Sequence, residues 1–139
     1  MRLGSEDTAW LHMEDPANPM VINSLLLLGG TLDLARLQAI LEKRGLPARF
    51  RMCVVESERP LRLPRLEPDP KFDLARHVVH AELPAGEAAL RDFVSREIAV
   101  PLPRDRPLWK TILVDRGPSP TAILFRVHHA LADGFALLA

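Results

Sequence analysis

Apolar and polar positions along the chain alternate with the periods of strands and helices. The longest apolar run covers residues 20–30 and predicts a buried strand. Apolar residues recur at helical spacing over 34–41, and Thr31 or Asp33 provides the cap of that helix. Residues 49–57 then alternate as a strand does. The first part of the chain is therefore predicted to be a β-α-β unit.

The second part of the pattern predicts a loop, a strand, a helix and a hairpin. Prolines spread over residues 58–72 favour a surface loop with at most a short edge piece, because proline has no backbone donor. An extended segment is expected at 77–83, and an amphipathic helix follows it. Two strands, 108–114 and 121–127, are joined by a turn that favours antiparallel pairing. The order of elements predicts an α/β chain.

Composition and charge narrow the classes of function. A chain of 139 residues that is 47% hydrophobic and 26% charged is typical of one folded domain. Because 18 basic and 18 acidic residues give a net charge of zero, nucleic-acid binding is not expected. The single cysteine and an acidic N-terminal segment predict a cytoplasmic protein. No apolar run reaches the roughly 20 residues of a membrane span, so membrane contact would be peripheral.

Two adjacent histidines and an Asp-Gly pair stand near the end of the chain. In a strand that continues past Val127, His128 and His129 project to opposite faces, so only one imidazole faces a given channel. Since the ordinary pKa of an imidazole is about 6.5, one histidine suffices as a general base. Asp133 has two interpretations, which stay open: it caps a helix beside Gly134, or its carboxylate fixes the loop that orients an imidazole.

Metal and serine chemistry are disfavoured by the pattern. Vicinal histidines on opposite strand faces do not readily bind one ion, and no further ligands occur at metal-site spacing, so no metal is expected. A serine nucleophile lacks its Gly-x-Ser-x-Gly turn. The remaining histidines are expected at the surface or in supporting positions, with the segment 76–80 near the site entrance as an option; they are His12, His77 and His80.

Residues 128–134, His-His-Ala-Leu-Ala-Asp-Gly, match the HHxxxDG motif of the CoA-dependent acyltransferase superfamily. Further stretches resemble, in order and spacing, the N-terminal part of bacterial wax ester synthase/diacylglycerol acyltransferases. They are DTAWLHMEDPANPMVINSLLLLGG, RFR, DPKFDLARHVVHAELP and RPLWKTILVD. The resemblance covers essentially the whole chain. It implies an α+β two-layer sandwich with a mixed sheet and packed helices, one N-terminal half of a two-domain chloramphenicol-acetyltransferase-like fold.

The resemblance also implies an activity and a set of site residues. Members of the family transfer a fatty acyl group from acyl-CoA, which is a substrate and not a cofactor, to diacylglycerol or a long-chain alcohol. His129 is then the general base, His128 supports its geometry, and Asp133 orients the motif. The residues expected to shape the substrate site are Gly134, Pro107, Leu108 and Trp109.

The resemblance finally implies what a lone domain lacks. We expect residues 1–139 to be an N-terminal acyltransferase domain truncated just after the motif, with the second domain absent and the chain by itself inactive. The implied partners are acyl-CoA, a lipid acceptor, the missing C-terminal domain and the surface of a membrane or lipid droplet. Two alternatives remain: a non-catalytic lipid-binding module or decayed paralogue, and condensation-type acyl transfer from a carrier protein.

Overall fold

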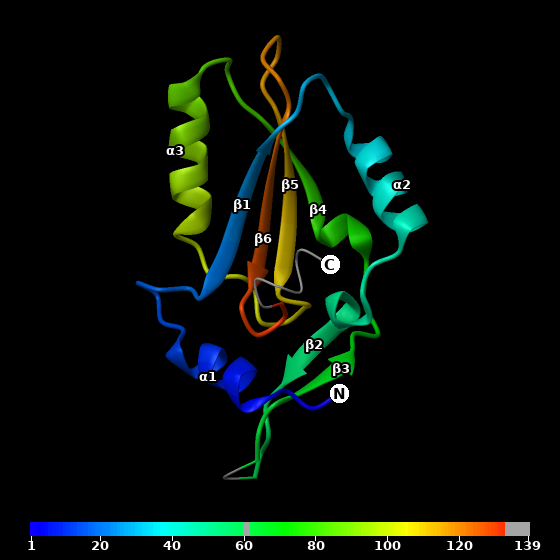
Figure 1. Ribbon diagram of the computed structural model, residues 1–139, viewed down its shortest axis with the longest axis vertical. Helices are drawn as coiled ribbons and strands as arrows, with labels where there is room; N and C mark the ends of the chain where they lie inside the picture. The colour runs from blue at the N-terminus through cyan, green and yellow to red at the C-terminus, as the bar shows by residue number, and fades with distance from the viewer. Residues whose placement is uncertain (60–61, 133–139) are drawn as a thin grey trace.

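A four-stranded mixed sheet forms the body of the protein (Figure 1). The computed structural model describes residues 1–59 and 62–132. The strand order is β1-β6-β5-β4, where β4 runs parallel to β5 and β6 runs antiparallel to both of its neighbours. The bounds of these strands are Val21–Leu27 for β1, Val78–Glu82 for β4, Trp109–Asp115 for β5 and Ala122–His128 for β6. The antiparallel pair predicted near the end of the chain is therefore confirmed.

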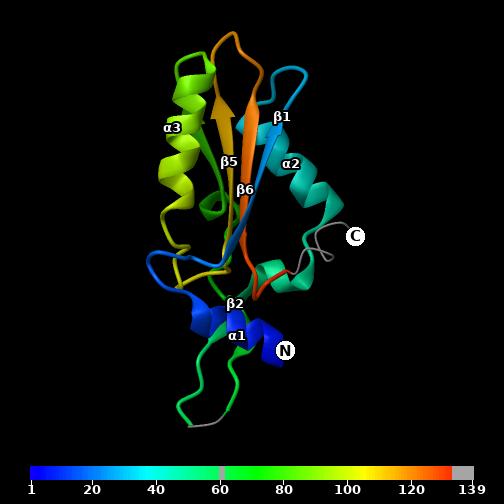
Figure 2. The ribbon, with the colours of Figure 1, turned by 60° about the vertical axis from the view of Figure 1, so that its left-hand side comes forward.

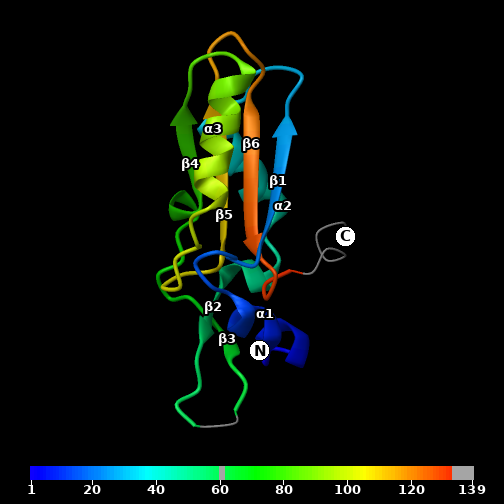
Figure 3. The same ribbon diagram turned by 90° about the vertical axis from the view of Figure 1, so that its left-hand side faces the viewer.

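Helices cover both faces of this sheet. Figure 3 shows α3 in front of the sheet and α2 behind it. Helix α3 packs Leu90 against Ile112 and Leu124, and α2 packs Leu37 into a second cluster with Leu113 and Val127. The mixed sheet with packed helices that we expected is confirmed, with a helix on each face where the expectation was two layers. The helix bounds are Ser5–Met13 for α1, Leu34–Arg44 for α2 and Glu87–Ile98 for α3, with short 3-10 turns at Ala48–Arg51 and Leu74–Arg76.

Local signals explain where α2 begins and ends. The Asp33 carboxylate accepts a hydrogen bond from the Arg36 N–H at 2.8 Å, so Asp33, and not Thr31, is the cap. At the other end, Gly45 has a φ of 75°, a conformation that a residue with a Cβ rarely adopts. The Gly45 N–H donates to the carbonyl of Leu41 at 3.0 Å and closes the last turn.

A separate two-stranded sheet corrects the predicted β-α-β unit. Strand β2 (Met52–Val55) pairs antiparallel with β3 (Arg65–Pro68) and takes no part in the larger sheet. Strand β3 is the short edge piece that the sequence analysis allowed within the predicted loop at 58–72. This strand forms although Pro64 precedes it and Pro68 ends it. Its Leu66 side chain is fully buried, and proline is tolerated because β3 pairs with β2 along one side only. Figure 1 shows this hairpin below the end of β6.

The first apolar run is a strand, but it is not a buried one. Strand β1 lies at the edge of the sheet, and its three consecutive leucines are 43%, 50% and 56% exposed; they are Leu25, Leu26 and Leu27. The core is instead centred on β5 and β6, which have neighbours on both sides. Hydropathy alone does not separate an edge strand from a central one, which is why the prediction of burial was wrong. None of the helices in the described part of the chain has the length and apolar composition needed to span a bilayer.

The contrast between neighbouring strands yields a stability prediction. Leu124→Ala on β6 removes a side chain that is 1% exposed, and we expect it to lower the free energy of unfolding by about 2–5 kcal/mol. The matched control is Leu26→Ala on β1, whose side chain is 50% exposed and whose loss costs less because it already contacts water. Urea denaturation measures both, and equal losses for the two variants would contradict this placement of the core.

Candidate functional site

The histidine pair lies where β6 ends and the chain turns. His128 is the last residue of β6 and is completely buried, whereas His129 lies in the following turn and is half-buried. The Leu131 N–H donates to the carbonyl of His128 at 2.9 Å and closes the turn. The expectation that the two imidazoles project from a continuing strand to opposite faces is therefore wrong in its cause, although only His129 is partly exposed. The cause is the turn, since the strand does not continue through His129.

The buried imidazole of His128 is held in one tautomer. Its Nδ1 accepts a hydrogen bond from the Ala130 N–H at 3.0 Å, so the proton of the neutral ring resides on Nε2. Nε2 lies 3.6 Å from Oε1 of Glu14, and the Glu14 carboxylate is itself paired with Arg104. Burial, reinforced by the positive charge of Arg104 and by His129, lowers the pKa of His128 to about 4. His128 is consequently neutral near pH 7 and suits a supporting role better than proton transfer.

The ring of His129 is accessible and stacks on an aromatic partner. The Trp10 ring lies with its centroid 4.6 Å from that of His129, at an interplanar angle of 25°. This contact restricts rotation of the imidazole without closing off its edge, where the ring nitrogens lie. A histidine that is held in place and partly exposed can exchange a proton with a group that approaches it.

Helix α1 and the residue that follows it contact both histidines and the turn. Asp7 and Trp10 are three residues apart on α1, so their side chains project from one side of the helix, and Glu14 directly follows the last residue of α1. The Asp7 carboxylate pairs with the Arg49 guanidinium at 2.8 Å, and Nη2 of Arg49 also donates to the carbonyl of Ala130 at 3.2 Å. Figure 2 shows α1 beneath the end of the sheet.

The sequence analysis did not identify these N-terminal residues as part of the site. They lie more than 110 positions before the histidines, and no local pattern signals a contact over that separation. The only available signal was the resemblance of residues 7–30 to the family. The contact is a product of the tertiary fold, in which the N-terminal helix returns to the end of the last strand.

Two of the residues predicted to shape the substrate site belong to the core beside it. Leu108 and Trp109 are 1% and 3% exposed, and the carbonyl of Leu108 accepts the N–H of His128 at 2.9 Å. The Trp109 indole N–H donates to the carbonyl of Phe50 at 2.8 Å. Pro107 precedes them and accepts the Trp109 N–H through its carbonyl at 2.8 Å. Asp133 and Gly134 lie outside the described residues.

A cavity of about 210 Å³ reaches Trp109 from the side of the sheet that carries α3. Buried Arg126 lines it together with Leu102, while Lys110 and Arg106 bring further positive charge. Arg126 is anchored by the Asn23 side chain at 3.1 Å and by Glu97 at 3.8 Å. The structure therefore places Trp109 at a cavity wall next to the last strand.

The other histidines divide into one supporting and two exposed residues. His77 is 2% exposed, donates from Nδ1 to the carbonyl of Trp109 at 2.9 Å, and stacks on that indole. Burial lowers its pKa. His12 is exposed on α1. His80 is exposed at the opposite end of the strands from His128, so the option that it lies at the site entrance is wrong, because β4 runs parallel to β5 and carries His80 away.

His80 has two acidic neighbours. Glu82 and Asp115 bring carboxylate oxygens within 4.8 Å of a ring nitrogen of His80 and of each other. All three side chains are exposed, and exposed acidic groups of this kind are common on protein surfaces. Nothing else at that end of the sheet points to an ion, so the cluster carries no assignment.

Comparison with protein families and curated relatives agrees with this geometry. The model of the wax ester synthase/diacylglycerol acyltransferase catalytic domain matches residues 3–139. Two Mycobacterium tuberculosis proteins named as diacylglycerol O-acyltransferases are each 32% identical to this chain over 145 residues. The alignments cover 97% and 99% of this chain, and 29% and 54% of those proteins. The chain therefore belongs to the wax ester synthase/diacylglycerol acyltransferase family, as the sequence motifs predicted.

Solved structures support the same fold class. The wax ester synthase/diacylglycerol acyltransferase from Marinobacter aquaeolei VT8 superposes with a TM-score of 0.79 at 27% identity, over 99% of this chain and 35% of that chain. The first condensation domain of the CDA synthetase gives a TM-score of 0.69 at 22% identity, over 93% of this chain and 34% of that chain. The second likeness concerns the fold alone. In both cases the match is to about a third of the solved chain.

The buried neutral state of His128 predicts a pH-dependent stability. The pKa of His128 is lowered in the folded protein, so between about pH 6.5 and pH 4 the unfolded chain binds a proton that the folded chain does not. Stability from this group is complete above pH 6.5 and is lost as the pH falls. We expect His128→Asn to lose less stability than the wild type between pH 7.5 and pH 5 in urea denaturation. If His128→Asn lost as much stability as the wild type, the neutral state of His128 would be contradicted. Both proteins keep a smaller pH-dependent loss from His77, whose pKa burial also lowers.

The stacked pair predicts a spectroscopic signature. The ring current of Trp10 shields the Cε1 proton of His129, so Trp10→Leu is expected to move that proton resonance downfield in NMR spectra. Trp10→Phe, which keeps a smaller aromatic ring, should give an intermediate shift. The resonance of His80, at the other end of the sheet, serves as the internal reference. A His129 resonance that does not respond to either variant would show that the rings are not stacked in solution.

Proposed function

We propose that the protein is an O-acyltransferase that moves a fatty acyl group from acyl-CoA to diacylglycerol or a long-chain alcohol, with His129 as the general base. The observation that carries the proposal is the division within the histidine pair. His128 is buried, neutral and hydrogen-bonded to the turn, whereas His129 is held against Trp10 and remains accessible. Membership of the acyltransferase family supplies the reaction class.

The proposed reaction needs one base and no acyl-enzyme. The acceptor hydroxyl is a poor nucleophile while it is protonated, so the His129 imidazole takes its proton as the oxygen attacks the thioester carbonyl carbon. The tetrahedral intermediate then collapses, the carbon–sulfur bond breaks, and the departing thiolate takes the proton back from the imidazolium. The products are the ester and free CoA, and His129 returns to its neutral state.

The remaining site residues have proposed supporting roles. We assign orientation of the motif to Asp133 and close backbone approach to Gly134, in keeping with the family motif that contains them. Pro107, Leu108 and Trp109 are proposed to form the scaffold behind the acyl site, which agrees with the burial of all three. His128 orients the turn through the Ala130 N–H.

The relatives on which the proposal draws are longer than this chain. This chain covers between 29% and 54% of the two M. tuberculosis relatives, and we propose that the acyl and CoA channels are completed by a further domain like the remainder of those relatives. Contact with a membrane or lipid droplet would bring the insoluble acceptor to the site. Activity is therefore tested on the protein as expressed from its natural gene, after its intact mass has been measured.

The test is the release of CoA by a His129 variant. We expect His129→Ala to lower kcat/KM for CoA release from a long-chain acyl-CoA by about 10²–10⁴-fold, because this is the usual contribution of a general base. His80→Ala removes an exposed imidazole at the far end of the sheet and is the matched control. Thiol release is followed with a chromogenic disulfide, and Cys53 sets a constant background.

Other outcomes of this assay separate the alternatives. A rate that is unchanged in His129→Ala refutes the assignment of the base. Binding of a fatty acyl ligand without CoA release, in the wild type and in His129→Ala alike, identifies a lipid-binding module. Acyl transfer from a carrier protein but not from acyl-CoA identifies condensation-type chemistry, for which the likeness to condensation domains offers only the shared fold.

A further inference from the structure

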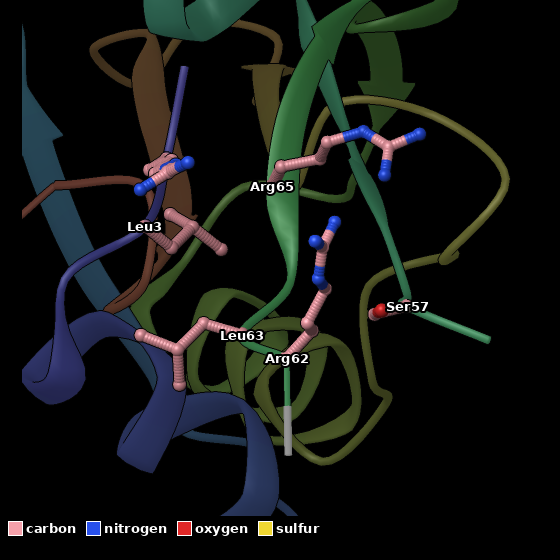
Figure 4. Close-up of a pocket in the computed structure, with 6 residues that line it drawn as sticks. Leu3, Ser57, Arg62, Leu63 and Arg65 are labelled. Atoms are coloured by element: carbon pink, nitrogen blue, oxygen red, sulfur yellow. The ribbon is translucent and has the colours of Figure 1, made fainter. Parts of the chain in front are cut away.

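A pocket of about 290 Å³ lies between the N-terminal segment and the β2–β3 hairpin, away from the histidine pair (Figure 4). Three of its lining residues are arginines, one from the N-terminal segment and two from the stretch that leads into β3, and the others are one serine and two leucines. They are Arg2, Arg62, Arg65, Ser57, Leu3 and Leu63. The proposed reaction makes no use of this pocket.

The backbone places two of these arginines opposite each other. Arg2 and Arg65 are partners in an antiparallel bridge, which is fastened by a hydrogen bond from the Leu66 N–H to the carbonyl of Met1 at 2.7 Å. Directly opposed residues of an antiparallel pair project to the same side, and like charges there are destabilising. A bound anion would offset this repulsion, which the pairing of Arg65 with Glu67 already weakens.

The positive charge of the pocket is incompletely balanced within the described part of the chain. Arg65 pairs with Glu67, but no carboxylate there lies within ion-pair distance of Arg2 or Arg62. Figure 4 shows the Arg62 side chain rising between Leu63 and Ser57 toward Arg65. Leu3, which is 2% exposed, and Leu63, which is 53% exposed, form an apolar side to the pocket.

We propose that this pocket binds a phosphate group of a ligand. The planar guanidinium fork matches two phosphate oxygens at once, and three such groups with a serine hydroxyl form a set of donors that suits a phosphate better than a single carboxylate. One source of that phosphate is the nucleotide part of acyl-CoA, and for this source the inference rests on the proposed function. The other source with the same chemistry is the headgroup of an anionic phospholipid.

The test compares three probes on the protein as expressed from its natural gene. Isothermal titration measures binding of inorganic pyrophosphate and of CoA, and co-sedimentation measures binding to phosphatidylcholine vesicles with and without phosphatidylglycerol. We expect Arg62→Gln and Arg2→Gln each to raise the Kd for pyrophosphate at least tenfold. Arg62→Lys keeps the charge but loses the fork, so it should restore binding in part. Arg91→Gln, an exposed arginine on α3, is the matched control and should bind as the wild type does.

Each outcome decides the proposal. Loss of CoA binding in Arg62→Gln assigns the phosphate to acyl-CoA, and loss of vesicle binding alone assigns it to a lipid headgroup. No pyrophosphate binding by the wild type, or equal binding by Arg62→Gln with an unchanged circular dichroism spectrum, overturns the proposal. His129→Ala should bind pyrophosphate normally, so a failed assignment of the catalytic base and a failed phosphate site are distinguishable.

Discussion

The hydrogen bond from the Ala130 N–H to Nδ1 of His128 decides how the chain leaves the central sheet. It ends β6 at His128, sets the ring tautomer, and turns His129 away from the interior. Had the strand continued, His129 would project to the face of β6 that packs against α2. Burial keeps this imidazole neutral, its Nδ1 accepts the Ala130 N–H, and its Nε2 lies 3.6 Å from the Glu14 carboxylate without a hydrogen bond. The accessible histidine is thus a consequence of the buried one.

Two elements distant in sequence support that turn. Helix α1 supplies Trp10 against His129, and Glu14, which directly follows the helix, lies beside His128. Arg49 joins Asp7 of α1 to the carbonyl of Ala130. These contacts act on the turn from outside the sheet. Their combined effect is a restriction of side-chain rotation at the turn.

Arg126 stabilises the same end of β6 from within the sheet. It lies on the same face as His128, and although it is 1% exposed its guanidinium reaches Asn23 on β1, the carbonyl of Val100 at 2.6 Å and the carboxylate of Glu97. Burial lowers its pKa, and the charge of Glu97 opposes that effect. A buried charge with a full set of partners is tolerated, but removal of one partner is costly. Arg126 therefore ties edge strand β1, central strand β6 and the end of α3 into one unit.

The sequence by itself determined the features that depend on neighbours along the chain. The period of apolar residues located α2, α3 and the β5–β6 pair, and Asp33 and Gly45 marked the ends of α2. The HHxxxDG motif indicated the superfamily, and the other matching stretches indicated the family. Only the tertiary structure decided that β1 is an exposed edge, that β2 pairs with β3, and that α1 packs on the histidine turn. Strand order and long-range packing depend on which surfaces meet in space. The spacing of apolar residues along the chain does not determine the free energy of those contacts. The motif therefore identified the two histidines from the sequence. Only the fold showed that His129 is the partly exposed one and that Trp10 stacks on its ring.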